Sequence, residues 1–103
     1  MSGDPALPAK VAEIVVDLPR ARSLSADGTI SWSVGERPFA ALGQSGIEIR
    51  LDIAIAAAAT RTPDTAPSPR GKEWVRFNPR ELDGHAVDRL RAWLELAYRF
   101  VSG

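Results

Sequence analysis

The sequence contains no cysteine and only one histidine, His85, among its 103 residues. Without cysteine the chain has no disulfide framework, no cysteine-ligated zinc site and no thiol nucleophile. A single histidine excludes every site that needs two. Thirteen basic residues balance thirteen acidic ones, so the chain lacks the net positive charge that marks many nucleic-acid-binding proteins.

Long hydrophobic runs are also absent. The longest run has seven residues, Ile53–Ala59, whereas a membrane span needs about 18 or more. Residues 1–5 have neither the basic flank nor the apolar segment of a secretory signal. We therefore expect a cytoplasmic protein that has no membrane partner.

The composition that remains is typical of a soluble globular domain, with 45% hydrophobic and 25% charged residues. A chain of this length buries roughly two-thirds of its unfolded surface when it folds. It needs neither a metal nor a disulfide for stability. We expect a single domain over residues 1–103 without a cofactor.

Helical periodicity appears near both ends of the chain. The first apolar stripe consists of Leu7, Val11, Ile14, Val15 and Leu18. The longest helix is predicted after Asp83, with an apolar stripe at Val87, Leu90, Leu94, Ala97, Tyr98 and Val101. Between them, residues 53–60 have strong helix propensity and no polar face, which predicts a short buried helix capped by Asp52.

Alternating apolar and polar residues predict strands at 29–34 and 47–51. A short strand is predicted at 39–42 after the turn at 35–38, and a fourth strand with mixed faces at 74–77. The first three follow one another with tight links and form an antiparallel meander. Residues 20–28 and the proline-rich residues 61–71 are predicted to be loops, the second of them mobile. The predicted fold is therefore α+β: a four-stranded antiparallel sheet with the N-terminal and C-terminal helices packed on one face. The deepest core is expected at Ile47, Ile49, Leu51, Leu90, Leu94 and Val101.

Several segments resemble the MmcQ/YjbR-like family of small α+β "double-wing" domains. The run from Trp32 to Leu42, Trp-Ser-Val-Gly-Glu-Arg-Pro-Phe-Ala-Ala-Leu, is similar to that family's hairpin, with Arg37 where the family usually has lysine. Residues 46–51 and the close of the chain, with Ala97-Tyr98, fit its third strand and last helix. The luciferase-like small α+β domains share much of this outline and are the second choice. The resemblance covers residues 30–101 and implies a DNA-binding function, but no catalytic residue.

No catalytic constellation is present in the sequence. No serine lies in a Gly-x-Ser-x-Gly elbow, and both glycine-rich phosphate-loop patterns are missing. His85 with Asp83 and Asp88 has no further ligand at a useful spacing, so no metal site is predicted and His85 is interpreted as a solvated first-turn residue. Acidic residues such as Glu48 are interpreted as outward residues of strands. We expect a protein that is not an enzyme.

Two partner hypotheses from different classes remain open, a weak nucleic-acid interaction and a protein interaction or homodimer. Arg70-Gly71-Lys72 after a proline-rich stretch resembles half of a minor-groove hook, although a flexible solubilising loop explains it as well. The candidate contact residues for nucleic acid or another partner are Arg37, Arg70, Lys72, Trp74, Arg76 and Arg80. Trp74 either covers the core or forms part of an exposed apolar surface for a protein partner or a second copy of the chain.

Overall fold

The computed structural model describes residues 3–102, so residues 1, 2 and 103 of the expected domain lie outside the described part. The helices are α1 (Leu7–Val15), α2 (Ile53–Ala59) and α3 (Gly84–Ser102). The strands are β1 (Ala21–Ala26), β2 (Thr29–Val34), β3 (Arg37–Gly43), β4 (Gly46–Arg50), β5 (Thr65–Ser68) and β6 (Gly71–Phe77). They form one antiparallel sheet in the order β1-β2-β3-β4-β6-β5.

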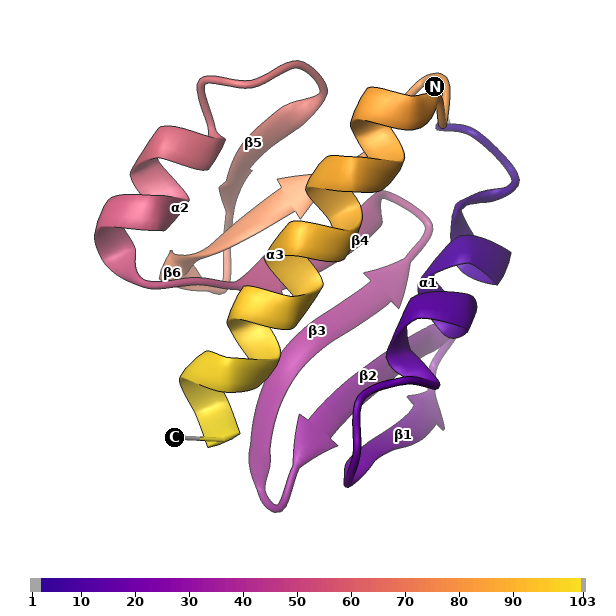
Figure 1. Ribbon diagram of the computed structural model, residues 1–103, viewed down its shortest axis with the longest axis vertical. Helices are drawn as coiled ribbons and strands as arrows, with labels where there is room; N and C mark the ends of the chain where they lie inside the picture. The colour runs from indigo at the N-terminus through magenta and orange to yellow at the C-terminus, as the bar shows by residue number, and fades with distance from the viewer. Residues whose placement is uncertain (1–2, 103) are drawn as a thin grey trace.

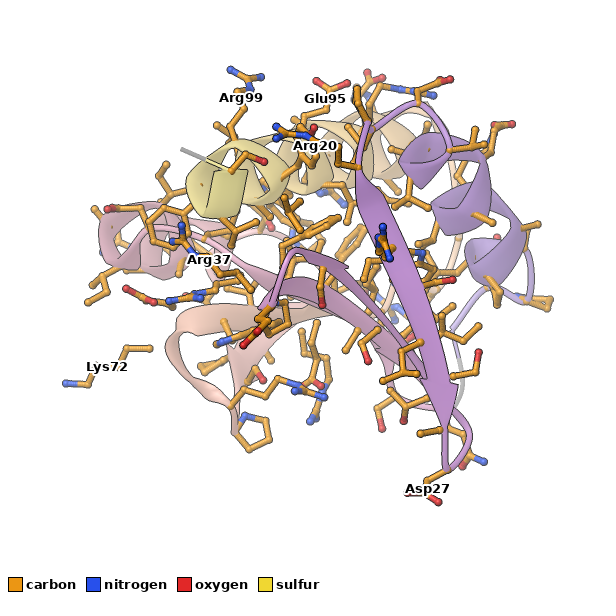
Figure 2. All side chains as sticks on the ribbon, turned by 90° about the horizontal axis from the view of Figure 1, so that it is seen from below. Arg20, Asp27, Arg37, Lys72, Glu95 and Arg99 are labelled. Carbon is orange, nitrogen blue, oxygen red and sulfur yellow. The ribbon has the colours of Figure 1, made fainter. Side chains whose placement is uncertain are left out.

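The three helices lie on the same side of the sheet, with α3 between α1 and α2 (Figure 1). The opposite face of the sheet carries no helix among residues 3–102 (Figure 2). None of the described helices is long and apolar enough to cross a membrane. The molecule therefore has one covered face and one open face.

The predicted meander is confirmed as β2, β3 and β4, which pair antiparallel in chain order, and burial alternates most clearly in β4. Ile47 and Ile49 of β4 are fully buried, and the intervening Glu48 is only half-buried. In register, Ile47 pairs with Leu42 of β3 and with Phe77 of β6, so apolar side chains continue across neighbouring strands.

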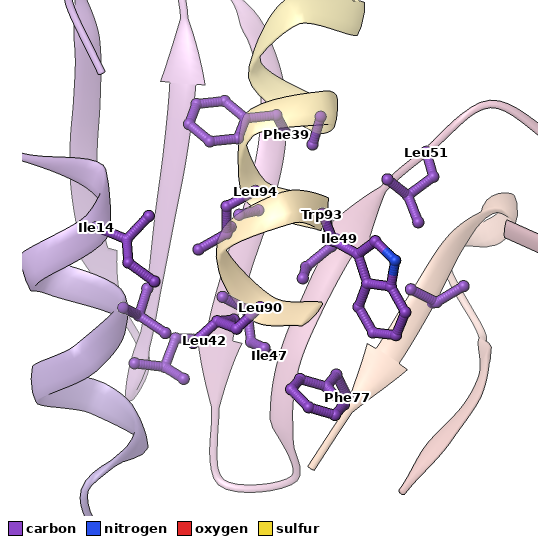
Figure 3. Close-up of a cluster of buried hydrophobic side chains, with 14 of the residues drawn as sticks. Ile14, Phe39, Leu42, Ile47, Ile49, Leu51, Phe77, Leu90, Trp93 and Leu94 are labelled. Atoms are coloured by element: carbon purple, nitrogen blue, oxygen red, sulfur yellow. The ribbon is translucent and has the colours of Figure 1, made fainter. Parts of the chain in front are cut away.

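The core lies between the sheet and α3 (Figure 3). The residues predicted to be deepest are all buried, namely Ile47, Ile49, Leu51, Leu90, Leu94 and Val101. The Trp93 ring meets the Phe77 ring edge to face at 5.3 Å, a favourable geometry for aromatic pairs. The predicted caps are also present, since the Asp52 carboxylate accepts from the Ala54 N–H and the Asp83 carboxylate from the Ala86 N–H.

The predicted four-stranded sheet is wrong, because the sheet has six strands. One of the additional strands is β1, within residues 20–28 that were predicted to be a loop. Asp27 and Gly28 form the two-residue turn to β2, with φ of 54° and 77°, as in a type I′ hairpin turn. All but the first residue of β1 are exposed, so no apolar alternation marks this edge strand.

The other additional strand is β5, within residues 61–71 that were predicted to be a mobile loop. Pro67 has no N–H to donate, and it is accommodated because β5 is the last strand of the sheet. Ser68, at the end of β5, is buried. The loop prediction is therefore wrong over Thr65–Ser68, and the mobility expected of residues 61–71 stays a prediction.

The helix predicted at residues 53–60 is present as α2, but the prediction that it is buried is wrong. Only Ala56 and Ala59 are buried, whereas Ile53 is 54% exposed and Ile55 is 38% exposed. The reason is that α2 packs with one narrow side against β5 and β6. Its remaining hydrocarbon surface faces solvent.

Candidate functional site

Two of the six predicted contact residues, Arg70 and Arg76, come together around Glu48 on the open face of the sheet, and a third, Trp74, lies beside them. Register places Arg76 of β6 directly opposite Glu48 of β4, and their side-chain atoms Nη2 and Oε2 are 3.8 Å apart. Arg70, in the turn between β5 and β6, donates from Nε to Glu48 Oε1 at 2.8 Å. The Ser68 hydroxyl donates to Glu48 Oε2. Glu48 therefore holds both arginines.

The electrostatics of this cluster are dominated by Glu48, whose side chain is only 16% exposed. Burial acts to raise the pKa of Glu48, but hydrogen bonds from Arg70 and Ser68 and the charges of both arginines outweigh it, so the pKa lies below its usual value. The carboxylate stays ionised at neutral pH. It offsets part of the positive charge that the sequence had suggested for this surface.

Trp74 lies beside the same cluster. The guanidinium of Arg70 is 5.3 Å from the centre of the Trp74 ring, within the range of a cation–π contact. Trp74 is half-buried, while its neighbours Val75 and Phe77 point into the core. The Trp74 side chain therefore neither covers the core nor is fully exposed to solvent. The Arg70 guanidinium contacts both the Trp74 ring and the Glu48 carboxylate.

The other three predicted contact residues do not join this cluster. Arg80 forms an ion pair with Asp64 at 3.2 Å. Arg37 begins β3, at the β2–β3 hairpin, and Lys72 of β6 points away from the sheet into solvent (Figure 2). The six residues therefore do not form one continuous basic surface.

His85 lies in a separate open hollow of about 590 Å³ beside the start of α3. Arg80 and Arg89 line this hollow together with the acidic side chains Asp64, Glu81 and Asp83. Positive and negative groups alternate around it, so it favours no single sign of ligand. Within residues 3–102 no three potential metal-ligating side chains form a group.

The feature that sequence reasoning missed is the exposed hydrocarbon of α2. The helix has the sequence Ile-Ala-Ile-Ala-Ala-Ala-Ala, without a single polar side chain, and five of these seven residues are exposed. A surface helix normally carries polar residues on its solvent side. We call the apolar area formed by Ile53, Ile55, Ala57, Trp74 and Phe100 the α2 surface.

Two shallow grooves run along the sides of α2. The groove between α2 and strands β5 and β6 has a volume of about 240 Å³ and is lined by Ile53, Ala57 and Trp74, among others. The groove between α2 and α3 has a volume of about 300 Å³ and is lined by Ile55 and Phe100. Ile53 therefore lines one groove and Ile55 the other, and α2 forms the ridge between the two grooves.

Cations surround the α2 surface. Lys72 lines the first groove and Arg99 the second, while Arg61 lies two residues beyond the end of α2. None of the three forms an ion pair within the described part of the chain. The nearby Asp52 carboxylate is engaged as the helix cap. Asp52 keeps its negative charge and lines the second groove, so three cations face one carboxylate around the apolar ridge.

Comparison with known proteins gives no relative of this chain. No family model, no curated protein and no solved structure matches it.

Duplex DNA is expected to bind weakly, with a Kd of about 10⁻⁴–10⁻⁶ M at physiological salt. The physical reason is that Glu48 and Asp64 already engage Arg70, Arg76 and Arg80, and the chain carries no net charge. Fluorescence anisotropy with a labelled duplex measures this affinity. A nanomolar Kd at that salt concentration would contradict the expectation and support the DNA-binding function that the family resemblance implies.

Proposed function

We propose that this chain is a non-catalytic protein-binding domain, and that its α2 surface binds an amphipathic helix with an apolar stripe and acidic flanks. The observation that carries the proposal is a helix without one polar side chain that has five of seven residues exposed. Exposed apolar patches with polar rims are typical of protein interaction sites.

The shape of the surface supports a helical partner. The α2 ridge is two turns long, and the grooves on its two sides offer places for side chains spaced at i, i+3, i+4 and i+7. Lys72 and Arg99 in the two grooves, with Arg61 just beyond the end of α2, complement acidic residues on the flanks of such a helix. This charge arrangement adds more to specificity and association rate than to affinity.

The size of the surface favours modest affinity. Full burial of an isoleucine side chain yields about 1.5–3 kcal/mol, and Ile53 and Ile55 have 54% and 38% of their surface left to bury. Their contribution is therefore on the order of 1 kcal/mol each. Association also costs translational and rotational freedom, so we expect a Kd in the micromolar range, about 10⁻⁵–10⁻⁶ M.

The chemistry of the open face supports binding rather than catalysis. Its ionisable groups Glu48, Arg70 and Arg76 are engaged with one another, and the α2 surface is mainly hydrocarbon. Two further parts of the proposal rest on the sequence alone. The first is a cytoplasmic location, and the second is membership of the MmcQ/YjbR-like family, which rests on the run from Trp32 to Leu42.

The proposal is tested with two fluorescent amphipathic peptides that share a leucine stripe and differ only in their flanks, glutamate in one and lysine in the other. We expect the glutamate-flanked peptide to bind with micromolar Kd and the lysine-flanked peptide to bind at least tenfold more weakly. The double variant Ile53→Asp/Ile55→Asp is expected to lose at least tenfold in affinity for the glutamate-flanked peptide.

The matched control is Val16→Asp, because Val16 is 79% exposed at the end of α1, away from α2. This variant should bind the peptide like the unaltered protein. Equal affinity for both peptides, or unchanged binding by the double variant with a native circular dichroism spectrum, contradicts the proposal.

A further inference from the structure

The two edges of the sheet differ in how they are protected against pairing with another strand. The β5 edge is four residues long, contains Pro67 and has a register shift beside it, all features that block strand addition. The β1 edge is six residues long, contains no proline and pairs with β2 without a register shift. The β1 edge is therefore open to a further strand.

The β1–β2 turn determines which backbone groups face this edge. In a two-residue hairpin the pair that closes the turn, here Ala26 and Thr29, exchanges both backbone hydrogen bonds. Hydrogen-bonded and non-hydrogen-bonded pairs then alternate along the strands. The N–H and C=O groups of Ser23 and Ser25 consequently point outward, where no strand of the described chain pairs with them, whereas the Ala21 N–H donates to the Leu18 carbonyl oxygen.

The side chains of β1 are complementary to those of an antiparallel copy. Arg20 and Arg22 lie at its beginning, and Asp27 follows its end. Antiparallel pairing of two copies brings arginine near aspartate at both ends, whereas parallel pairing brings like charges together. Leu24, 69% exposed, lies near the centre and is one of four exposed large hydrophobic residues among residues 3–102.

We propose that two copies of this chain associate through β1, antiparallel and about a two-fold axis at Leu24, to form one continuous sheet across the dimer. In this register Leu24 faces its equivalent in the second copy, and Ser23 pairs with Ser25. Each Ser23–Ser25 pair exchanges two backbone hydrogen bonds, because these are residues whose groups point outward. Arg22 lies opposite Ala26 of the second copy, next to its Asp27.

The face on which Leu24 lies also fits this arrangement. Leu24 pairs with Ser31 of β2, which belongs to the open face, whereas Trp32 on the other side is buried beneath the helices. The two leucines therefore meet on the open face without disturbing the core. The contact is small compared with standard interfaces, which bury about 1,200–2,000 Å² in total, so the dimer dissociates at low concentration.

The absence of cysteine in the chain allows a direct test by single-cysteine variants. Non-hydrogen-bonded partners in an antiparallel pair have Cα atoms about 4.5 Å apart, within the range of about 4.4–6.8 Å that a disulfide requires. Leu24→Cys is therefore expected to form a covalent dimer under mild oxidation at least tenfold faster than Val16→Cys, which reports random collisions at an exposed site.

Ser25→Cys is the matched control on β1 itself. In the proposed register its equivalents are displaced along the strands and lie beyond disulfide distance, so this variant should crosslink as slowly as Val16→Cys. Sedimentation of the unaltered protein over a series of concentrations should show a monomer–dimer equilibrium in which the dimer fraction rises with concentration. Leu24→Lys and Leu24→Glu should each be monomeric alone, and dimeric when mixed.

Any of three results would overturn the proposal. These are equal crosslinking rates for the three cysteine variants, faster crosslinking of Ser25→Cys than of Leu24→Cys, and a monomer at every concentration. Binding of an extended segment of another protein to β1, without a dimer of this chain, would overturn it as well. The test is independent of the proposed peptide-binding function, because Ile53→Asp/Ile55→Asp leaves β1 unchanged and should still dimerise.

Discussion

Replacing Leu94 with alanine is expected to lower the free energy of unfolding by about 2–5 kcal/mol. Leu94 is fully buried on the inward side of α3, which packs against β3 and β4 (Figure 3). The substitution removes three buried carbon atoms and leaves a cavity that the neighbouring side chains can fill only in part. The loss should appear as a lower denaturant midpoint at an unchanged slope of the unfolding curve.

Leu24→Ala is the matched control for this measurement. It removes the same atoms from a side chain that is 69% exposed, so the free energy of unfolding of the monomer should change by less than about 0.5 kcal/mol. A loss below about half a kcal/mol for Leu94→Ala would mean that the inward face of α3 has been assigned wrongly.

Replacing Gly46 with alanine is expected to cost more than about 2 kcal/mol of stability. Gly46 begins β4 with φ of +108°, a conformation that residues with a side chain rarely adopt. A Cβ atom there would lie 2.5 Å from the carbonyl oxygen of Phe77 and 2.8 Å from the Asn78 Cβ. The contact with Phe77 is to backbone, so relief requires β4 and β6 to separate.

Gly35→Ala separates backbone strain from this steric contact. Gly35 also has a positive φ, +61°, but an added Cβ would meet no heavy atom within 4 Å. It should therefore cost only about 1–2 kcal/mol. Thermal or denaturant unfolding of both variants gives the difference. Losses equal to within about 0.5 kcal/mol would show that β4 and β6 tolerate the additional atom.

The elements most readily predicted from the sequence are those with one dry and one wet face, such as β4 and α3. The alternation of Ile47 and Ile49 with Glu48 follows directly from burial on the helix side of β4. β1 and β5 could not be predicted in the same way, because they are edge strands. The edge position leaves β1 with exposed serines and allows Pro67 in β5, and neither produces an apolar alternation.

The candidate site was only partly predictable for a related reason. Residues 70–76 lie close in the sequence, so their proximity could be expected, but Glu48 joins them only through the pairing of β4 with β6. No local pattern indicates that pairing. The exposure of α2 could not be predicted either. An apolar run of seven residues suggests burial, and the run itself does not indicate how many elements pack against it.

The path of the chain through the sheet has a kinetic consequence. Strands β1 to β4 are joined by short turns and can assemble from local hairpins, which close on the order of microseconds. β6 must instead pair with β4 across a long excursion, so that residue 47 meets residue 77. Loop-closure entropy makes such non-local pairing the slower event. The junction between β4 and β6 therefore divides the sheet into an early-forming part and a part that completes the folded state late.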